Sequence, residues 1–226
     1  FFFQAEDGIR DYKVTGVQTC ALPISMADRC GGPQEKSGDF RPARQLHVGS
    51  GLDLQLVGED DAAELFAVIE SNREYLREWL PWLDATNSIE EEKAFISSSL
   101  EEYEKRDGVF YTIRLDGSII GTISLNWIDW GNKAAGVGYW LSKNRTGNGY
   151  VTKSCIRLME HCFDDLCLHR FVLEAAVDNI PSCEIAERLG MRLEGITKDR
   201  EWLYDHYVDA KLYAITKPEW DEKRSS

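Results

Sequence analysis

The stretch NRTGNGYVTKS, residues 144–154, combines residue types that suit anion binding. It follows the apolar run 137–141 and precedes a segment with helical spacing. Gly147 and Gly149 have no Cβ, so the backbone can turn tightly there and expose its amide hydrogens. The first amides of the following helix also lack intrahelical partners, and this combination favours a bound phosphate or pyrophosphate. We therefore expect a phosphate-binding joint between a strand and a helix.

Other chemistries fit the sequence less well, although a plain turn remains an alternative. A P-loop would end in Gly-Lys-Ser/Thr, and a dinucleotide fold needs a third glycine where Thr152 stands. A glycine-rich turn that only joins strand to helix accounts for the stretch equally well. No metal site is expected, because the spacing of His161 and His169 around Cys162 and Cys167 matches no structural zinc template. The six cysteines contain no CxxC pair, which indicates reduced thiols.

Hydrophobic spacing predicts the elements that position this joint. A strand at 52–56 precedes a helix capped by Asp60 or Asp61, and the Ser-x-x-Glu capping box at Ser88 begins a second helix. Asp116-Gly117 is a strong hairpin signal between two further strands. The remaining expected ranges are strands at 109–115, 119–127, 134–142, 169–177 and 207–215, and helices at 147–165 and 182–189. This order predicts a mixed α/β sheet.

Composition excludes several classes of protein. With 43% hydrophobic and 29% charged residues, the chain suits one globular domain with a substantial core. A net charge of −13 disfavours nucleic acid and anionic membrane surfaces, and suits a basic or amine-bearing partner. No apolar run approaches the roughly 18 to 20 residues that span a bilayer. A soluble, cytoplasmic protein is expected.

The two ends of the chain are expected to lie outside the domain. Residues 1–25 resemble a translated sequencing adaptor, and Met26 is hypothesised to be the true start. Residues 26–50 are rich in Gly, Pro, Arg and Ser and are expected to form a flexible leader. The domain is expected at 51–218, followed by a tail at 219–226.

Five ordered motifs carry a resemblance to a known family. They are GYWLS leading into TGNGYVT, then VDNIPS, ERLGMRLEG and REWLYDHYVDAKLY. Together they resemble the GCN5-related N-acetyltransferase (GNAT) family over about residues 52–215. The segment REWLPWLDATNSIEEEKAFI looks most like the branch that acetylates the N-terminal amine of a ribosomal protein. The resemblance implies a mostly antiparallel twisted sheet flanked by helices, the acyl-CoA N-acyltransferase fold.

The resemblance also implies a co-substrate, acetyl-coenzyme A, and no metal. Its pyrophosphate would lie in the glycine joint, and Asn179 would contact the pantetheine arm. The residues implied to bind it are Leu141, Ser142, Gly147, Asn148, Gly149, Tyr150, Val151, Thr152 and Asn179. Two positions depart from the family pattern, since Thr146 replaces Gln/Arg and Val151 replaces the final Gly/Ala, but the backbone amides survive both changes.

Direct attack of an amine on a thioester needs a base, an oxyanion site and an acid for the leaving thiolate. The resemblance places the base at Glu201 and the acid at Ser182. An apolar surround from Trp202, Tyr204 and Trp82 could raise the pKa of the carboxylate. Many relatives carry a glutamate on the preceding strand, where this chain has Gly136, so the base cannot come from there.

Several alternatives stay open at the level of sequence. Glu201 could be a solvated surface carboxylate, and Ser182 a helix N-cap. The acceptor could be a protein N-terminus or a small amine such as a polyamine or an antibiotic. The chain could also be an acyl-coenzyme A-binding module without turnover, although such a module needs no base. A homodimer is one expected assembly.

Overall fold

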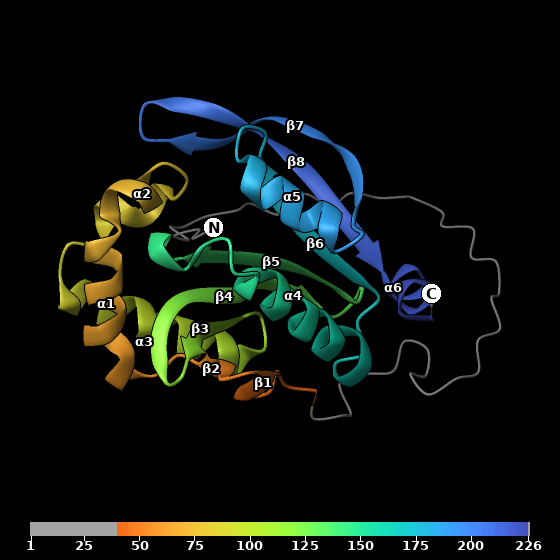
Figure 1. The fold of residues 1–226 in the computed structure, drawn as a ribbon, viewed down its shortest axis with the longest axis horizontal. Helices are drawn as coiled ribbons and strands as arrows, with labels where there is room; N and C mark the ends of the chain where they lie inside the picture. The colour runs from red at the N-terminus through yellow and green to blue at the C-terminus, as the bar shows by residue number, and fades with distance from the viewer. Residues whose placement is uncertain (1–39, 226) are drawn as a thin grey trace, which may run out of the picture. The chain divides into compact units, whose positions relative to one another are not determined.

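The computed structural model describes residues 40–225, and hypotheses about residues 1–39 lie outside this part of the chain. Its centre is an eight-stranded sheet in the order β1-β2-β3-β4-β5-β6-β8-β7 (Figure 1). Only the β5–β6 pair is parallel, and every other neighbouring pair is antiparallel. The expected mixed, mostly antiparallel sheet flanked by helices is confirmed.

The element bounds follow the sequence patterns closely in the middle of the chain. The strands are β1 (Gln45–Gly49), β2 (Leu52–Leu56), β3 (Val109–Leu115), β4 (Ser118–Asp129), β5 (Ala134–Leu141), β6 (Arg170–Ala176), β7 (Arg192–Leu203) and β8 (His206–Thr216). The α-helices are α1 (Ala62–Ser71), α2 (Arg73–Arg77), α3 (Ile89–Lys105), α4 (Tyr150–Glu160), α5 (Ile180–Arg188) and α6 (Lys217–Ser225). Short helical turns are η1 (Glu59–Asp61), η2 (Pro81–Ala85), η3 (Lys143–Arg145) and the π-helical η4 (His161–Asp165).

Local signals explain several of these boundaries. Asp116 and Gly117 both have positive φ, 50° and 86°, in the tight turn between β3 and β4. The Ser88 hydroxyl accepts from the amide of Glu91 at 3.2 Å and begins α3. The Glu91 carboxylate accepts from the amide of Asn87 at 2.6 Å, one residue earlier than a regular capping box would place it.

Two apolar clusters hold the helices on the sheet. One joins α1, α2 and part of α3 to the sheet and includes Trp140 of β5. The other joins α4 and α5 to the sheet, and Tyr139 of the same strand packs against it. Because successive strand residues point to opposite faces, β5 is packed on both faces.

The expected leader and tail are corrected by the structure. Residues 40–50 belong to the domain, because Leu46 of β1 is buried and the Tyr103 and Tyr111 hydroxyls donate to the carbonyls of Pro42 and Ala43 at 2.9 and 2.6 Å. Residues 219–225 lie in α6, whose Trp220 is buried with its ring 6.3 Å from that of Phe163. Both segments were misjudged because each contributes a single large apolar anchor, which is too little to create a periodic pattern.

The helix expected at 147–165 changes its character at His161. The α-helical part ends at Glu160, and a π-helical turn follows. His161 is buried, its Nε2 accepts from the amide of Ala43 at 3.0 Å, and its Nδ1 lies 2.6 Å from Asp165 Oδ2. The neutral imidazole therefore carries its proton on Nδ1, and this residue is a core histidine.

The cysteines only partly follow the expectation of reduced thiols. Cys155, Cys162 and Cys183 are free and buried, whereas Cys167 is disulfide-bonded. Among residues 40–225, no group of three His, Cys, Asp or Glu side chains is arranged to hold a metal ion. None of the helices described there has the length and apolarity needed to cross a membrane.

Candidate active site

The parallel strands β5 and β6 stop pairing before they reach their carboxyl ends. They pair only from Ala134 and Arg170 to Val137 and Leu173. Beyond that point β5 stays hydrogen-bonded to β4 as far as Leu141, while β6 stays hydrogen-bonded to β8 as far as Ala176. The sheet therefore opens between these two strand ends, and their facing backbone groups can bond an extended, amide-containing ligand.

The glycine joint lies directly after the open end of β5. Gly147 and Gly149 have φ of 77° and 74°, the left-handed region that glycine occupies without strain. A Cβ at either position would meet no atom within 4 Å, so the backbone conformation and not crowding requires glycine there. The Asn148 amide group donates to the carbonyls of Arg145 and Thr146 at 3.1 and 3.0 Å and braces the turn.

The amino end of α4 is open to an anion. Gly149 is its N-cap and has no side chain to satisfy the first amides, and the first turn contains no acidic residue. Within the helix, the first backbone bond to this cap runs from Lys153 N to Gly149 O at 3.0 Å. The amides of Tyr150, Val151 and Thr152 are thus available to a phosphate, with the helix dipole in the favourable direction. Leu141 and Ser142, which precede the joint, are buried and fix it to the sheet.

Ser182 lies across the opening from β5. Its hydroxyl is 2.8 Å from the hydroxyl of Tyr139, which follows the last β5–β6 pair. Burial raises the pKa of Tyr139, so its phenol stays neutral and can exchange a proton with Ser182. Sequence reasoning missed Tyr139, although its alternation with Trp140 placed it on the face that α5 covers.

Asn179, and not Ser182, caps α5. The Asn179 side-chain oxygen accepts from the amide of Ser182 at 3.2 Å. Because Asn179 fills the capping role, the hydroxyl of Ser182 is directed to Tyr139 instead of to its own helix. The N-cap alternative for Ser182 is therefore wrong. The Asn179 Oδ1 is already an acceptor in this cap, which leaves its amide nitrogen as the group that could meet a ligand.

Glu201 lies on β7 opposite Val208. Its side chain is half-buried, and this burial raises the pKa of the carboxyl group above its ordinary value of 4.5. Smaller effects come from Arg200, which lowers this pKa, and Glu174, which raises it. Trp202, one member of the expected aromatic surround, does not enclose Glu201: it is 51% exposed and packs edge-on against Tyr207, on the other face of the strand.

An open pocket lies between α2 and the β7–β8 turn, and its lining includes Leu203, which shares a strand face with Glu201. Its volume is about 500 Å³. The lining residues are Arg77, Glu78, Leu203, Tyr204, Asp205 and His206. In Figure 1 this turn, α2 and the first turn of α5 face the same side of the view as the end of β5.

The structure also explains why β5 supplies no carboxylate. A Cβ on Gly136 would come within 2.2 Å of the Trp127 indole nitrogen. The indole of the neighbouring strand β4 thus covers the position where a glutamate side chain would begin. The expectation that the base comes from elsewhere agrees with this packing.

Comparison with known proteins identifies the family. The family model described as "Acetyltransferase (GNAT) domain" matches residues 52–192. The ribosomal-protein-serine acetyltransferase of Escherichia coli (strain K12) is 32% identical over 169 residues, which cover 75% of this chain and 94% of that protein. The chain belongs to the GNAT acetyltransferase family, and it is an acetyl-coenzyme A-dependent N-acetyltransferase that resembles the ribosomal-protein branch.

Solved structures agree with this assignment. RimL, a ribosomal L7/L12 alpha-N-protein acetyltransferase in complex with coenzyme A, has a TM-score of 0.75 at 29% identity, over 77% of this chain and 99% of that one. The microcin C7 self immunity acetyltransferase MccE, in complex with acetyl-CoA and AMP, has a TM-score of 0.73 at 30% identity, over 75% and 94%. The two structures share the fold, although one is an acetyltransferase of ribosomal protein L7/L12 and the other is a microcin C7 self immunity acetyltransferase.

Proposed function

We propose that this chain transfers the acetyl group of acetyl-coenzyme A to the N-terminal amine of a ribosomal protein. The observation that carries this proposal is the opening between β5 and β6, with a glycine joint at its mouth, the Tyr139–Ser182 pair across it and a half-buried Glu201 nearby. The similarity to the Escherichia coli ribosomal-protein-serine acetyltransferase supports the choice of acceptor.

In this proposal the glycine joint and the first amides of α4 bind the pyrophosphate. The pantetheine arm then runs into the opening between the strands, where it bonds the unpaired backbone of β5 and β6 as an added strand would. Asn179, at the start of α5, contacts the arm. This arrangement fixes the thioester near the end of β5 before the amine arrives.

Glu201 acts as the general base. An acceptor ammonium group has a pKa of about 8 to 10 and must lose a proton before it can attack. A carboxylate whose pKa is raised by burial accepts that proton more readily than an ordinary one. The free amine then attacks the thioester carbonyl, and the carbon–nitrogen bond forms as the carbon–sulfur bond breaks.

Ser182 protonates the leaving thiolate. Its hydroxyl gives a proton to sulfur and regains one from the hydroxyl of Tyr139, which water restores in turn. The attacking nitrogen loses its second proton to solvent, which balances the proton that water supplies to Tyr139. The products are the acetylated amine and coenzyme A, with a net release of one proton. The neutral phenol suits this relay because burial keeps it protonated.

The pocket between α2 and the β7–β8 turn suits a positively charged acceptor. Its acidic side chains are Glu78 and Asp205, while the charge of its only arginine among the lining residues, Arg77, is paired with Asp84 at 2.8 Å. A cationic N-terminus or polyamine is attracted to such a pocket. The likeness to MccE keeps a small-molecule acceptor as the second candidate.

Thiol release from acetyl-coenzyme A tests the proposal directly. Parallel reactions would contain peptides with the N-terminal sequences of ribosomal proteins, the same peptides with blocked N-termini, polyamines and aminoglycosides. We expect release only with free peptide N-termini, and mass spectrometry should find one acetyl group on the terminal amine. Release with small amines but with no peptide would contradict the proposed acceptor.

A further inference from the structure

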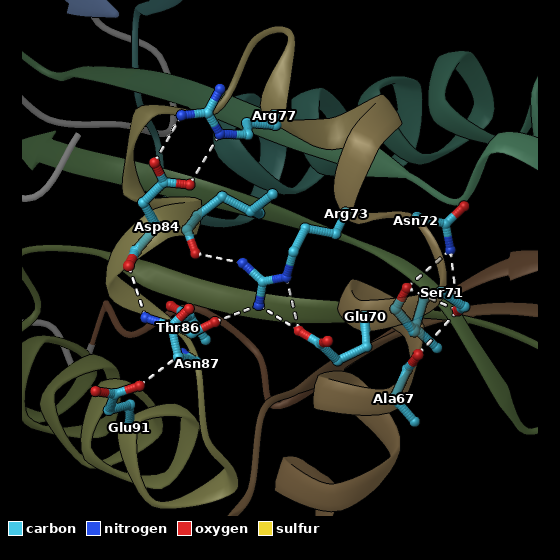
Figure 2. A network of polar contacts seen from close by, with 12 residues as sticks. Ala67, Glu70, Ser71, Asn72, Arg73, Arg77, Asp84, Thr86, Asn87 and Glu91 are labelled. Atoms are coloured by element: carbon cyan, nitrogen blue, oxygen red, sulfur yellow. Dashed lines mark hydrogen bonds and ion pairs between the residues drawn. The ribbon is translucent and has the colours of Figure 1, made fainter. Parts of the chain in front are cut away.

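The segment between α2 and α3 is fixed by two arginines of α2 (Figure 2). Arg73 donates to the carbonyl of Leu83 at 2.7 Å, and also to the carbonyl of Thr86 and the carboxylate of Glu70. These bonds satisfy backbone acceptors that would otherwise point out of a short irregular loop. Arg73 therefore ties the middle of η2 and the residue that follows it to α2.

Arg77 extends this network to a distant part of the chain. Its Nε and Nη2 donate to the two oxygens of Asp84 at 2.9 and 2.8 Å, a bidentate pair. The same guanidinium lies 3.7 Å from the centre of the Tyr204 ring. The Tyr204 hydroxyl donates to the carbonyl of Leu80 at 2.5 Å. We call Arg77, Asp84 and Tyr204 the clamp.

The backbone at Tyr204 needs such support. Its φ is 60°, the left-handed region, which is unfavourable for a residue with a large side chain. Strained conformations of this kind persist only where the surrounding contacts determine them. The clamp supplies those contacts at the ring and at the hydroxyl.

The β7–β8 turn, which the clamp holds, is flanked by residues of the candidate site. Leu203 and Asp205, the neighbours of Tyr204, line the pocket between α2 and the β7–β8 turn. Glu201 itself lies on β7, three residues before Tyr204 of the turn. A shift of the turn would therefore move the pocket wall and the carboxylate together.

We propose that Arg77 is a positioning residue for acceptor transfer. It acts through Asp84 and Tyr204 and fixes the turn that shapes the pocket and orients Glu201. This inference rests on the proposed function in assigning the pocket to the acceptor. The competing explanation is an ordinary exposed ion pair, which typically contributes little to stability and nothing to catalysis.

Arg224, in the C-terminal helix α6, provides a matched control for Arg77. It pairs with Asp164 at 2.8 Å and lies 5.9 Å from the centre of the Trp220 ring, so it also combines a carboxylate with an aromatic ring. Its side chain is 46% exposed, close to the 48% of Arg77. The variants Arg77→Met and Arg224→Met therefore remove similar interactions in different places.

Steady-state kinetics separate the two explanations. For Arg77→Met we expect kcat/KM for the acceptor to fall by roughly 10- to 10²-fold, because a small misplacement of reacting groups has effects of that size. The KM for acetyl-coenzyme A should stay unchanged, since the glycine joint does not touch the clamp. Arg224→Met should leave both constants at the parental values. Arg77→Lys should not restore activity, because lysine keeps the charge but cannot form the bidentate, stacked arrangement.

Hydrogen exchange gives a readout that is independent of the acceptor. The amides of residues 203–207 should exchange faster in Arg77→Met than in the parent, while those of α6 stay unchanged. If the parent acetylates only small amines, the ribosomal acceptor is wrong, and the kinetic comparison is made with such an amine. The positioning role of the clamp is still tested in this case. Parental kcat/KM in Arg77→Met, unchanged exchange at the turn, or an equal loss in Arg224→Met would overturn the inference.

Discussion

Substitution of Gly149 by valine should weaken coenzyme A binding through backbone strain. Gly149 has φ of 74°, and a Cβ there would meet no atom within 4 Å, so steric overlap within the protein contributes nothing. A left-handed conformation costs an ordinary residue roughly 1–2 kcal/mol, and a β-branched residue is a still rarer occupant of this region. Because the joint is exposed, it can relax away from the binding conformation.

A cost of about 1–2 kcal/mol corresponds to a loss of roughly 5- to 30-fold in affinity. Titration calorimetry with coenzyme A measures this loss directly. Gly149→Asn is the matched control, because asparagine tolerates the left-handed region and should retain most of the affinity. Parental affinity in Gly149→Val, or an equal loss in both variants, would refute the reasoning.

Three further predictions concern other parts of the chain. Glu201→Gln should lower turnover by about 10²- to 10⁴-fold with coenzyme A affinity unchanged, and the loss should shrink at high pH, where free amine forms without a base. Since burial raises the pKa of Glu201, the acid limb of the parental rate profile should lie above 4.5. Parental turnover in the variant at neutral pH would exclude this base. A chain that begins at Phe40 should keep its cooperative thermal transition. A chain that begins at Leu52 lacks buried Leu46 and strand β1, so its free energy of unfolding should fall by at least about 1.5–3 kcal/mol. Equal melting temperatures for the two would contradict the assignment of residues 40–50 to the domain. Burial lowers the pKa of His161 below 6.5, so the folded state binds its proton less readily than the unfolded state does. Stability should therefore fall as pH drops from about 6.5 through the folded pKa. His161→Gln should flatten this part of a pH–stability curve measured by urea unfolding.

The local features of the fold could be read from sequence because they depend on a few neighbouring residues. Ser88 begins a helix and Asp116-Gly117 closes a hairpin wherever the rest of the chain goes. The same is true of the joint, since Gly147 and Gly149 determine its left-handed turns without help from other segments. Strand β1 and helix α6 were missed because Leu46 and Trp220 are isolated anchors in polar surroundings.

The candidate site could be read only in part. The glycine joint has a physical signature, whereas the roles of Glu201 and Ser182 came from resemblance and remain predictions. Nothing in the spacing of Arg77, Asp84 and Tyr204 indicated that they meet, because Tyr204 is brought to α2 by a long hairpin. Tyr139 could have been assigned to a helix-covered face by alternation, but its contact with Ser182 depends on where α5 lies.

By itself the sequence determined where the chain can turn and which helix end leaves its amides free. Only the tertiary structure decided where β5 and β6 separate, because that point depends on how far β5 pairs with β4 and β6 pairs with β8. It also decided that Asn179 caps α5 and directs Ser182 to Tyr139, and that Glu201 is half-buried on its hairpin. Burial and pairing between distant segments set these properties, and neither is encoded in the spacing of neighbouring residues.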